Sequence, residues 1–240
     1  MRKKPEAILF DMGGVLLESA DMWTEAGFEK SYPNGLPACF SKDWFMDMSQ
    51  DIMRRYAALS EPRPAMDLRH CIAEWLPKAG VDPSPESIRH CYDYLGWWEV
   101  RPLFPFVHEA LTKCNALGYR IGLISNTLLT SAYHRALFRD EGIYDLFEFM
   151  VFSAEFGWNK PNPQIFQHAL DAMKLKPQNA WYVGDKPHRD ICGAHGVGMT
   201  AVLVDGPYEH RVNDSPAHVP DIRIRDISEL PELLASEFAG

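Results

Sequence analysis

Short apolar runs alternate with amphipathic stretches over most of this chain, and several of the runs end abruptly on polar residues. The first run, at residues 7–10, stops at Asp11 and is followed by Gly13 and Gly14. Short apolar runs bounded by turn signals are typical of strands that are buried on both faces. We therefore expect a buried strand that presents a carboxylate at its carboxyl end.

The same pattern recurs beyond residue 101, with helical segments between the apolar runs. Strands are expected at residues 119–124, 149–152, 180–183, 200–204 and 222–224, and helices at residues 105–117, 131–138, 163–173 and 228–238. Alternating strands and helices predict a parallel sheet with helices on both faces. The expected fold class is α/β, with a three-layer Rossmann-like core.

Residues 18–100 interrupt this alternation. They hold amphipathic segments rich in Trp, Met and Arg, separated by Pro-rich breaks at residues 61–64 and 82–85. Ser84 followed by Pro85 has the pattern of a helix start. We expect residues 18–100 to form an α-helical insert, and residues 1–17 and 101–240 to form the core.

Composition argues against several classes of protein. The chain has 240 residues, of which 46% are hydrophobic, and a net charge of −9, which argues against a general nucleic-acid surface. Its 5 cysteines include no CxxC pair, so neither a disulfide framework nor a zinc site is expected. No apolar run matches a signal peptide or a membrane span. We expect a cytoplasmic protein without a membrane partner; the sequence does not indicate its oligomeric state.

Polar residues follow three of the expected strands and form a candidate site. These residues are Asp11, the pair Ser125 and Asn126, and Asp185. The carboxyl ends of parallel strands lie at one edge of the sheet, where ligands bind in α/β proteins. Lys160 follows a fourth strand and can reach the same edge, and Asp190 comes shortly after Asp185.

These residue types suit phosphoryl transfer. Carboxylates of Asp11, Asp185 and Asp190 are hard oxygen ligands of the kind that Mg²⁺ prefers. A hydroxyl from Ser125, the adjacent backbone N–H and the ammonium of Lys160 would hold phosphoryl oxygens. Asp11 is the candidate nucleophile. Each residue alone is typical of a helix cap or a solvated loop, whereas the ordered set is far more specific.

The ordered set resembles the four motifs of the haloacid dehalogenase-like hydrolase superfamily, and residues 18–100 are similar to that family's small α-helical cap. The resemblance spans nearly the whole chain. It implies a central Asp11 strand, a small phosphorylated metabolite as substrate, and an aspartyl-phosphate intermediate on Asp11. It also implies that Ser125, Asn126 and Lys160 bind substrate, that Lys160 assists catalysis, and that Mg²⁺ binds Asp11, Asp185, Asp190 and the Gly13 carbonyl.

Gly13 departs from the family pattern, because phosphatases of the family usually have a second Asp at this position. That Asp protonates the leaving group and later activates water, so this side-chain chemistry is missing. Glu18 and Asp21 are candidate replacements. Two alternatives stay open: a non-catalytic or weakly active phospho-ligand-binding homologue, and a metal-independent 2-haloacid dehalogenase that uses Asp11. Retention of both later acids, Asp185 and Asp190, favours the Mg²⁺-dependent phosphatase.

Overall fold

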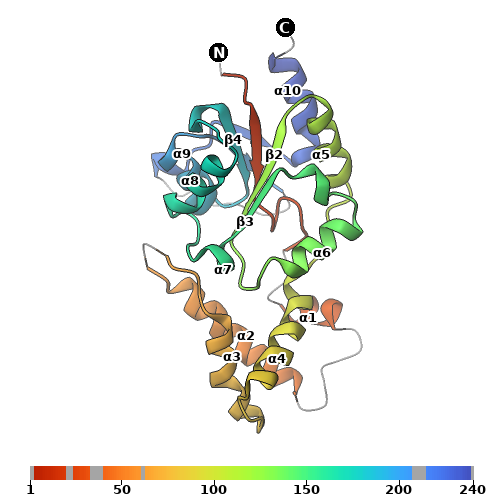
Figure 1. Ribbon diagram of the computed structural model, residues 1–240, viewed down its shortest axis with the longest axis vertical. Helices are drawn as coiled ribbons and strands as arrows, with labels where there is room; N and C mark the ends of the chain where they lie inside the picture. The colour runs from red at the N-terminus through yellow and green to blue at the C-terminus, as the bar shows by residue number, and fades with distance from the viewer. Residues whose placement is uncertain (1–2, 20–23, 33–39, 61–62, 207–214, 239–240) are drawn as a thin grey trace.

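A parallel sheet forms the centre of the protein (Figure 1). The computed structural model describes residues 3–19, 24–32, 40–60, 63–206 and 215–238. Its 6-stranded sheet has the order β3-β2-β1-β4-β5-β6, and every pair of neighbours is parallel. The strands are β1 (Ala7–Phe10), β2 (Arg120–Ser125), β3 (Phe149–Phe152), β4 (Ala180–Gly184), β5 (Thr200–Val204) and β6 (Ile222–Ile224). The predicted α/β class is confirmed.

Both faces of the sheet are buried, which explains the uninterrupted apolar runs. In β1, Ile8 and Phe10 belong to one apolar cluster, while Ala7 and Leu9 belong to the other. The first cluster includes side chains of α5 (Val107–Ala116), α6 (Ala132–Asp140) and α10 (Leu230–Phe238). The second includes side chains of α8 (Pro163–Ala172) and α9 (Cys192–Val197). The result is a helix–sheet–helix sandwich.

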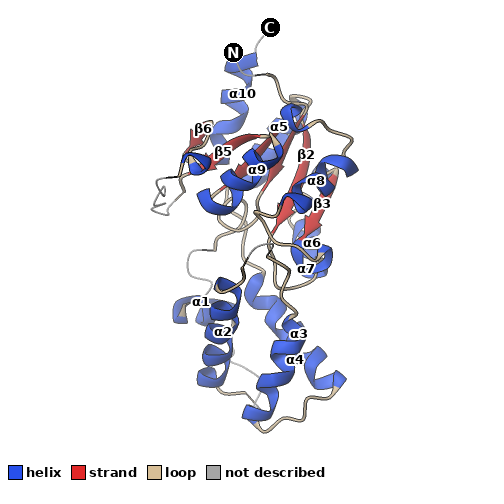
Figure 2. Ribbon diagram, turned by 90° about the vertical axis from the view of Figure 1, so that its left-hand side faces the viewer, coloured by secondary structure: helices blue, strands red, loops and turns tan. Residues whose placement is uncertain are grey.

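The first four helices after β1 gather beyond the carboxyl ends of the strands (Figures 1 and 2). They are α1 (Glu25–Ser31), α2 (Lys42–Ala57), α3 (Leu68–Trp75) and α4 (Pro85–Glu99). Each begins at a residue whose side chain accepts a backbone N–H, namely Thr24, Ser41, Asp67 and Ser84. Their apolar side chains form a third cluster, which also includes Leu129 from the chain after β2. The division into core and cap domains stays a prediction.

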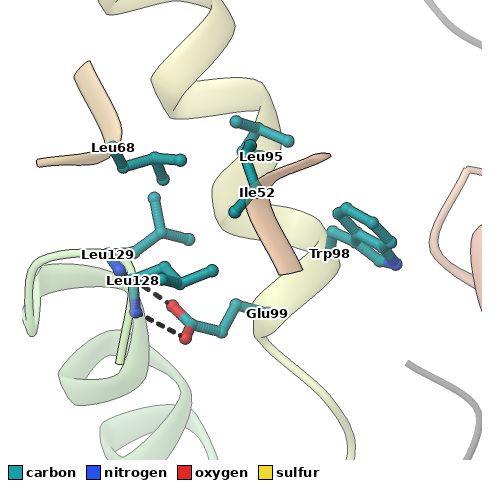
Figure 3. A pocket seen from close by; sticks show the side chains of 7 residues that line it. All are labelled: Ile52, Leu68, Leu95, Trp98, Glu99, Leu128 and Leu129. Atoms are coloured by element: carbon teal, nitrogen blue, oxygen red, sulfur yellow. Dashed lines mark hydrogen bonds between the residues drawn. The ribbon is translucent and has the colours of Figure 1, made fainter. Parts of the chain in front are cut away.

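Glu99, at the end of α4, joins these helices to the loop that follows β2 (Figure 3). Its two carboxylate oxygens accept the backbone N–H groups of Leu128 and Leu129, at 2.9 and 3.0 Å. An apolar pocket lies beside this contact, lined also by Ile52, Leu68, Leu95 and Trp98. Two side-chain hydrogen bonds and a shared apolar surface therefore fix the exit from the insert.

A second contact joins the chain before α3 to the loop that carries Lys160. The Asn159 N–H donates to the Arg63 carbonyl at 2.9 Å, and the Asn159 side chain donates to the Pro64 carbonyl at 2.9 Å. Ala65 donates its N–H to the Gly157 carbonyl at 2.8 Å. The insert is thus attached to the loops that follow two neighbouring strands, β2 and β3.

The remaining differences from the sequence expectations concern element ends. Helix α5 begins at Val107, after the expected start at residue 105, and the last helix begins with a 3₁₀ turn, Ile227–Glu229. Short elements complete the chain: 3₁₀ helices Leu76–Ala79, Tyr144–Leu146, Pro177–Asn179 and Pro216–His218, helix α7 (Ser153–Phe156), and a π-helical turn, Pro187–Ile191. Within the described residues, no helix is long and apolar enough to span a membrane.

Candidate active site

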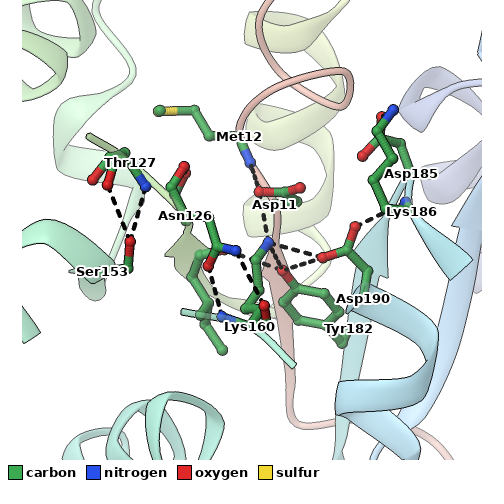
Figure 4. A network of polar contacts seen from close by, with 12 residues as sticks. Asp11, Met12, Asn126, Thr127, Ser153, Lys160, Tyr182, Asp185, Lys186 and Asp190 are labelled. Atoms are coloured by element: carbon green, nitrogen blue, oxygen red, sulfur yellow. Dashed lines mark hydrogen bonds and ion pairs between the residues drawn. The ribbon is translucent and has the colours of Figure 1, made fainter. Parts of the chain in front are cut away.

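Asp11 lies directly beyond the central strand, as the sequence predicts. Its N–H continues the sheet by donating to the Val183 carbonyl at 2.8 Å. One carboxylate oxygen, Oδ1, accepts the Met12 N–H at 2.7 Å and pairs with Lys160 Nζ at 2.7 Å (Figure 4). The other oxygen, Oδ2, accepts no hydrogen bond from the described residues. Asp11 is therefore a buried carboxylate that the protein holds by one oxygen, while its second oxygen is free.

Lys160 is fully buried and lies between two carboxylates. Besides Asp11, its Nζ contacts Asp190 Oδ1 at 2.8 Å, and it donates to the Tyr182 hydroxyl at 2.7 Å. Tyr182 in turn donates to the Ile124 carbonyl at 3.1 Å. Sequence reasoning missed Tyr182, since an aromatic residue inside an apolar strand looks like any other core side chain.

Asn126 uses its side chain to hold Lys160 in place. Its Oδ1 accepts the Lys160 N–H at 2.7 Å, and its Nδ2 donates to the Lys160 carbonyl at 3.2 Å and to the Tyr56 hydroxyl at 3.0 Å. Its side-chain amide is therefore committed to the protein, whereas its backbone N–H donates to no described residue. The only bond of the Ser125 hydroxyl to the described residues is long, 3.5 Å to the Asn126 carbonyl. Substrate binding by these two residues stays a prediction.

Three buried carboxylates meet at this edge of the sheet. Oxygen atoms of Asp11, Asp185 and Asp190 lie within 4.8 Å of one another. Oδ2 of Asp185 pairs with Lys186 Nζ at 2.6 Å, while its Oδ1 is buried without a hydrogen-bond partner. Asp190 is more fully occupied, because Oδ1 pairs with Lys160 and Oδ2 accepts the Lys186 N–H at 2.9 Å. Of Asp185 and Asp190, Asp185 therefore has the carboxylate oxygen that is more available to a ligand.

The cluster is electrostatically costly without a cation. Burial raises the pKa of Asp11 to about 6, with Lys160 opposing the rise and the charges of Asp190 and Asp185 adding to it. Burial also raises the pKa of Asp185, against the pull of Lys186. At Asp190 burial acts in the same direction, but Lys160 and Arg189 outweigh it and lower the pKa. Asp190 is therefore the stable counter-ion of Lys160, and Asp11 and Asp185 carry the excess negative charge.

These residues fit a hard divalent cation. Oxygen ligands of the type that Mg²⁺ takes are the unpartnered oxygen of Asp185, the Asp11 carboxylate and the Gly13 carbonyl, which accepts no hydrogen bond from the described residues. Repulsion among the buried carboxylates would fall when such an ion binds. The roles of Asp11, Gly13, Asp185 and Asp190 as metal ligands stay predictions.

Gly13 leaves open space where the family pattern has an acid. A Cβ atom at Gly13 would meet only the side chain of Ser19, at 3.7 Å, which is an ordinary van der Waals contact. Of the two candidate replacement acids, Glu18 makes no hydrogen bond or ion pair to Asp11 or Lys160, and Asp21 lies outside the described residues. The source of a proton for the leaving group stays open.

Comparison with known proteins identifies the family. A family model for haloacid dehalogenase-like hydrolases matches residues 5–198. The chain belongs to this family. The glyceraldehyde 3-phosphate phosphatase of Methanopyrus kandleri is 28% identical over an alignment of 236 residues, covering 95% of this chain and 97% of the relative. The phosphoserine phosphatase of Thermus thermophilus is 31% identical over 129 residues, covering 54% of this chain and 50% of the relative.

The solved structures agree on the fold. The 2-haloacid dehalogenase of Pseudomonas syringae superposes with a TM-score of 0.68 and 23% identity, covering 97% of this chain and 99% of its own. At that identity the match supports the shared architecture alone. The resemblance to the haloacid dehalogenase-like hydrolases, the Rossmann-like core and the assignment to a hydrolase family are thus confirmed.

The raised pKa of Asp11 predicts that its charge destabilises the metal-free protein. Because the folded-state pKa of about 6 lies above the ordinary value of 3.8, the stability associated with this group is lost as pH rises from about 4 to 6. At pH 7 with a chelator, Asp11→Asn should therefore raise the free energy of unfolding by about 1–3 kcal/mol. Chemical denaturation at pH 4 and pH 7 measures the effect.

Asp140→Asn is the matched control, because Asp140 is exposed and should leave the free energy of unfolding within about 0.5 kcal/mol of the wild type. A metal-free Asp11→Asn protein that is less stable than the wild type at pH 7 would contradict the electrostatic account.

Lys186 is predicted to compete with a metal ion for Asp185. Its Nζ lies 2.6 Å from Asp185 Oδ2, so a second cation at this carboxylate must work against its charge. Lys186→Gln should lower the half-saturating Mg²⁺ concentration by about three- to tenfold, as expected for removal of a nearby like charge. Titration of thermal stability with Mg²⁺ reads this out without turnover. Lys176→Gln is the control, because Lys176 is exposed and its replacement should leave the half-saturating Mg²⁺ concentration unchanged. Weaker Mg²⁺ binding by Lys186→Gln would refute the competition.

Proposed function

We propose that this protein is a Mg²⁺-dependent phosphatase of a small phosphorylated metabolite that forms an aspartyl-phosphate intermediate on Asp11. The observation that carries the proposal is the state of Asp11, which has one oxygen held by Lys160 and Met12 and the other free. Relatives named as phosphatases of glyceraldehyde 3-phosphate and phosphoserine support the same reaction class. We also propose that residues 18–100 act as a cap over a core of residues 1–17 and 101–240.

The reaction has two steps. Asp11 Oδ2 attacks the phosphorus atom, a new P–O bond forms, and the bond to the leaving alkoxide breaks. Water then attacks the phosphorus of the aspartyl phosphate, which releases inorganic phosphate and restores the carboxylate. Splitting the displacement in this way replaces one difficult step by two easier ones.

The surrounding residues would stabilise charge in both steps. Lys160 holds Asp11 in one orientation and neutralises part of its charge, and the Ser125 hydroxyl and the Asn126 N–H can donate to phosphoryl oxygens. Mg²⁺ would neutralise part of the phosphate charge. Its ligands would be Asp11, Asp185 and the Gly13 carbonyl. The burial of this group strengthens every electrostatic contact within it.

The two alternatives explain the site less well. A dehalogenase reaction on carbon gains nothing from Asp185, whose buried, unpartnered oxygen is costly without a cation. A purely binding homologue has no need for a carboxylate whose second oxygen is left free beside a buried lysine. Chloride release from a 2-haloacid without Mg²⁺ would support the first alternative, and stabilisation by phosphate without turnover would support the second.

The central prediction is Mg²⁺-dependent phosphate release. The wild type should hydrolyse para-nitrophenyl phosphate and at least one metabolite in a panel of phosphate monoesters, and Asp11→Asn should lose at least about 10³-fold of that activity because the nucleophile is removed. Asp140→Asn should keep wild-type rates. Absence of phosphate release by the folded wild type across the panel would overturn the proposal.

Gly13→Asp tests whether the missing acid limits the rate. A Cβ atom at Gly13 meets only Ser19, at an ordinary contact distance of 3.7 Å, and general acid–base help typically contributes about 10²–10⁴-fold. We expect a gain of about 10- to 100-fold on alkyl phosphates, whose leaving groups need a proton, and little gain on para-nitrophenyl phosphate. Gly13→Asn, similar in size but unable to transfer a proton, is the control. An equal gain in both variants would point to packing instead of acid catalysis.

A further inference from the structure

The ammonium of Lys160 has an acceptor for each of its protons. An ammonium group has three donors and no acceptor. Its Nζ lies 2.7 Å from Asp11 Oδ1, 2.8 Å from Asp190 Oδ1 and 2.7 Å from the Tyr182 hydroxyl (Figure 4). The side chain is fully buried, so a proton that loses its acceptor has no bulk water to replace it. The orientation of Asp11 therefore depends on where the backbone places Lys160.

The insert holds the loop that carries Lys160. This loop, residues 157–162, lies between α7 and α8. A short antiparallel pairing joins its residues 157–159 to residues 63–65 of the insert. The hydrogen bonds of the pairing run from the Ala65 N–H to the Gly157 carbonyl at 2.8 Å and from the Asn159 N–H to the Arg63 carbonyl at 2.9 Å. The backbone directly before the lysine is thus fixed by the insert.

Asn159 adds a side-chain contact to the same segment of the insert. It is fully buried, and its Nδ2 donates to the Pro64 carbonyl at 2.9 Å. Its own carbonyl accepts the Asn162 N–H at 3.0 Å, which closes the turn through Lys160. Asn159 therefore connects the insert with the turn that places the lysine.

Tyr56 gives the insert a second hold on the lysine, through Asn126. The Asn126 side-chain amide binds both the N–H and the carbonyl of Lys160. Its nitrogen has two protons, and the second is donated to the Tyr56 hydroxyl, at the end of α2, at 3.0 Å. The guanidinium carbon of Arg63 lies 5.9 Å from the centre of the Tyr56 ring. The two holds therefore belong to one surface of the insert.

We propose that Tyr56 and Asn159 are positioning residues for Lys160, through which the docked insert sets the lysine between its two carboxylate partners. This inference rests on the proposed function and deepens it, because it makes the rate of the chemical step depend on how the insert is docked. Displacement of residues 63–65 would withdraw the support of Asn159 and release the lysine from its place beside Asp11. The nucleophile would then lose its fixed orientation.

Tyr56→Phe and Asn159→Ala test the proposal, with Tyr92→Phe as the matched control. The Tyr92 hydroxyl, in α4, accepts the Thr130 N–H at 2.8 Å, so the control also loses a hydrogen bond between the insert and the loop after β2. With para-nitrophenyl phosphate and saturating Mg²⁺, both test variants should lower kcat about 3- to 10-fold and leave KM within about twofold, as expected for loss of one hydrogen bond that acts on the reacting group. Tyr92→Phe should keep the wild-type kcat.

Hydrogen exchange measured by NMR tests the positioning without turnover. The Lys160 N–H is donated to Asn126 Oδ1 at 2.7 Å. It should exchange about 3- to 10-fold faster in Tyr56→Phe, because the Asn126 amide loses one of its anchors. In Tyr92→Phe the Thr130 N–H should exchange faster instead, with the Lys160 N–H unchanged. Circular dichroism checks folding, and if Asn159→Ala unfolds, Tyr56→Phe decides, since it removes only a hydroxyl from a half-buried residue.

The outcomes separate this inference from the proposed function. An equal loss of kcat in Tyr92→Phe would overturn the positioning, since any loosening of the insert would then have the same effect. A raised KM with unchanged kcat in the test variants would also overturn it, because their side chains would then bind substrate. Wild-type kcat and unchanged exchange at Lys160 would refute the positioning and leave the phosphatase intact. The expected exchange pattern in a protein that releases no phosphate would keep the positioning and overturn the phosphatase.

Discussion

The buried ammonium of Lys160 is the contact on which the candidate site depends. It lies between Asp11 and Asp190 at 2.7 and 2.8 Å, and without it three carboxylates would share one desolvated space. Removing one partner of a buried ion pair typically costs about 3–5 kcal/mol, because the remaining charges are left uncompensated. The hydrogen bonds between the Asn126 side chain and the Lys160 backbone, and the one that Lys160 donates to Tyr182, keep the ammonium in this position.

Sheet order explains why a lysine far along the chain can occupy that position. β1 is central, with β2 and β4 on either side, so the strand ends that carry Asp11, Ser125 and Asp185 are neighbours. The helices that lead into β2 and β4, α5 and α8, cover opposite faces of the sheet, and the strand order reverses beside β1, which is where ligands bind in doubly wound sheets. The loop with Lys160 follows β3 and reaches back over β2, anchored there by Asn126.

Much of the fold could be predicted because buried parallel strands are apolar runs and their ends are marked by a change to polar residues. The expected strands at residues 7–10, 149–152, 200–204 and 222–224 coincide with β1, β3, β5 and β6. The positions of the site residues followed from the same ends. Contacts between distant segments could not be predicted from the sequence. No local pattern indicates that Tyr182 would bind Lys160, or that the Asn126 side chain would bind the Lys160 backbone.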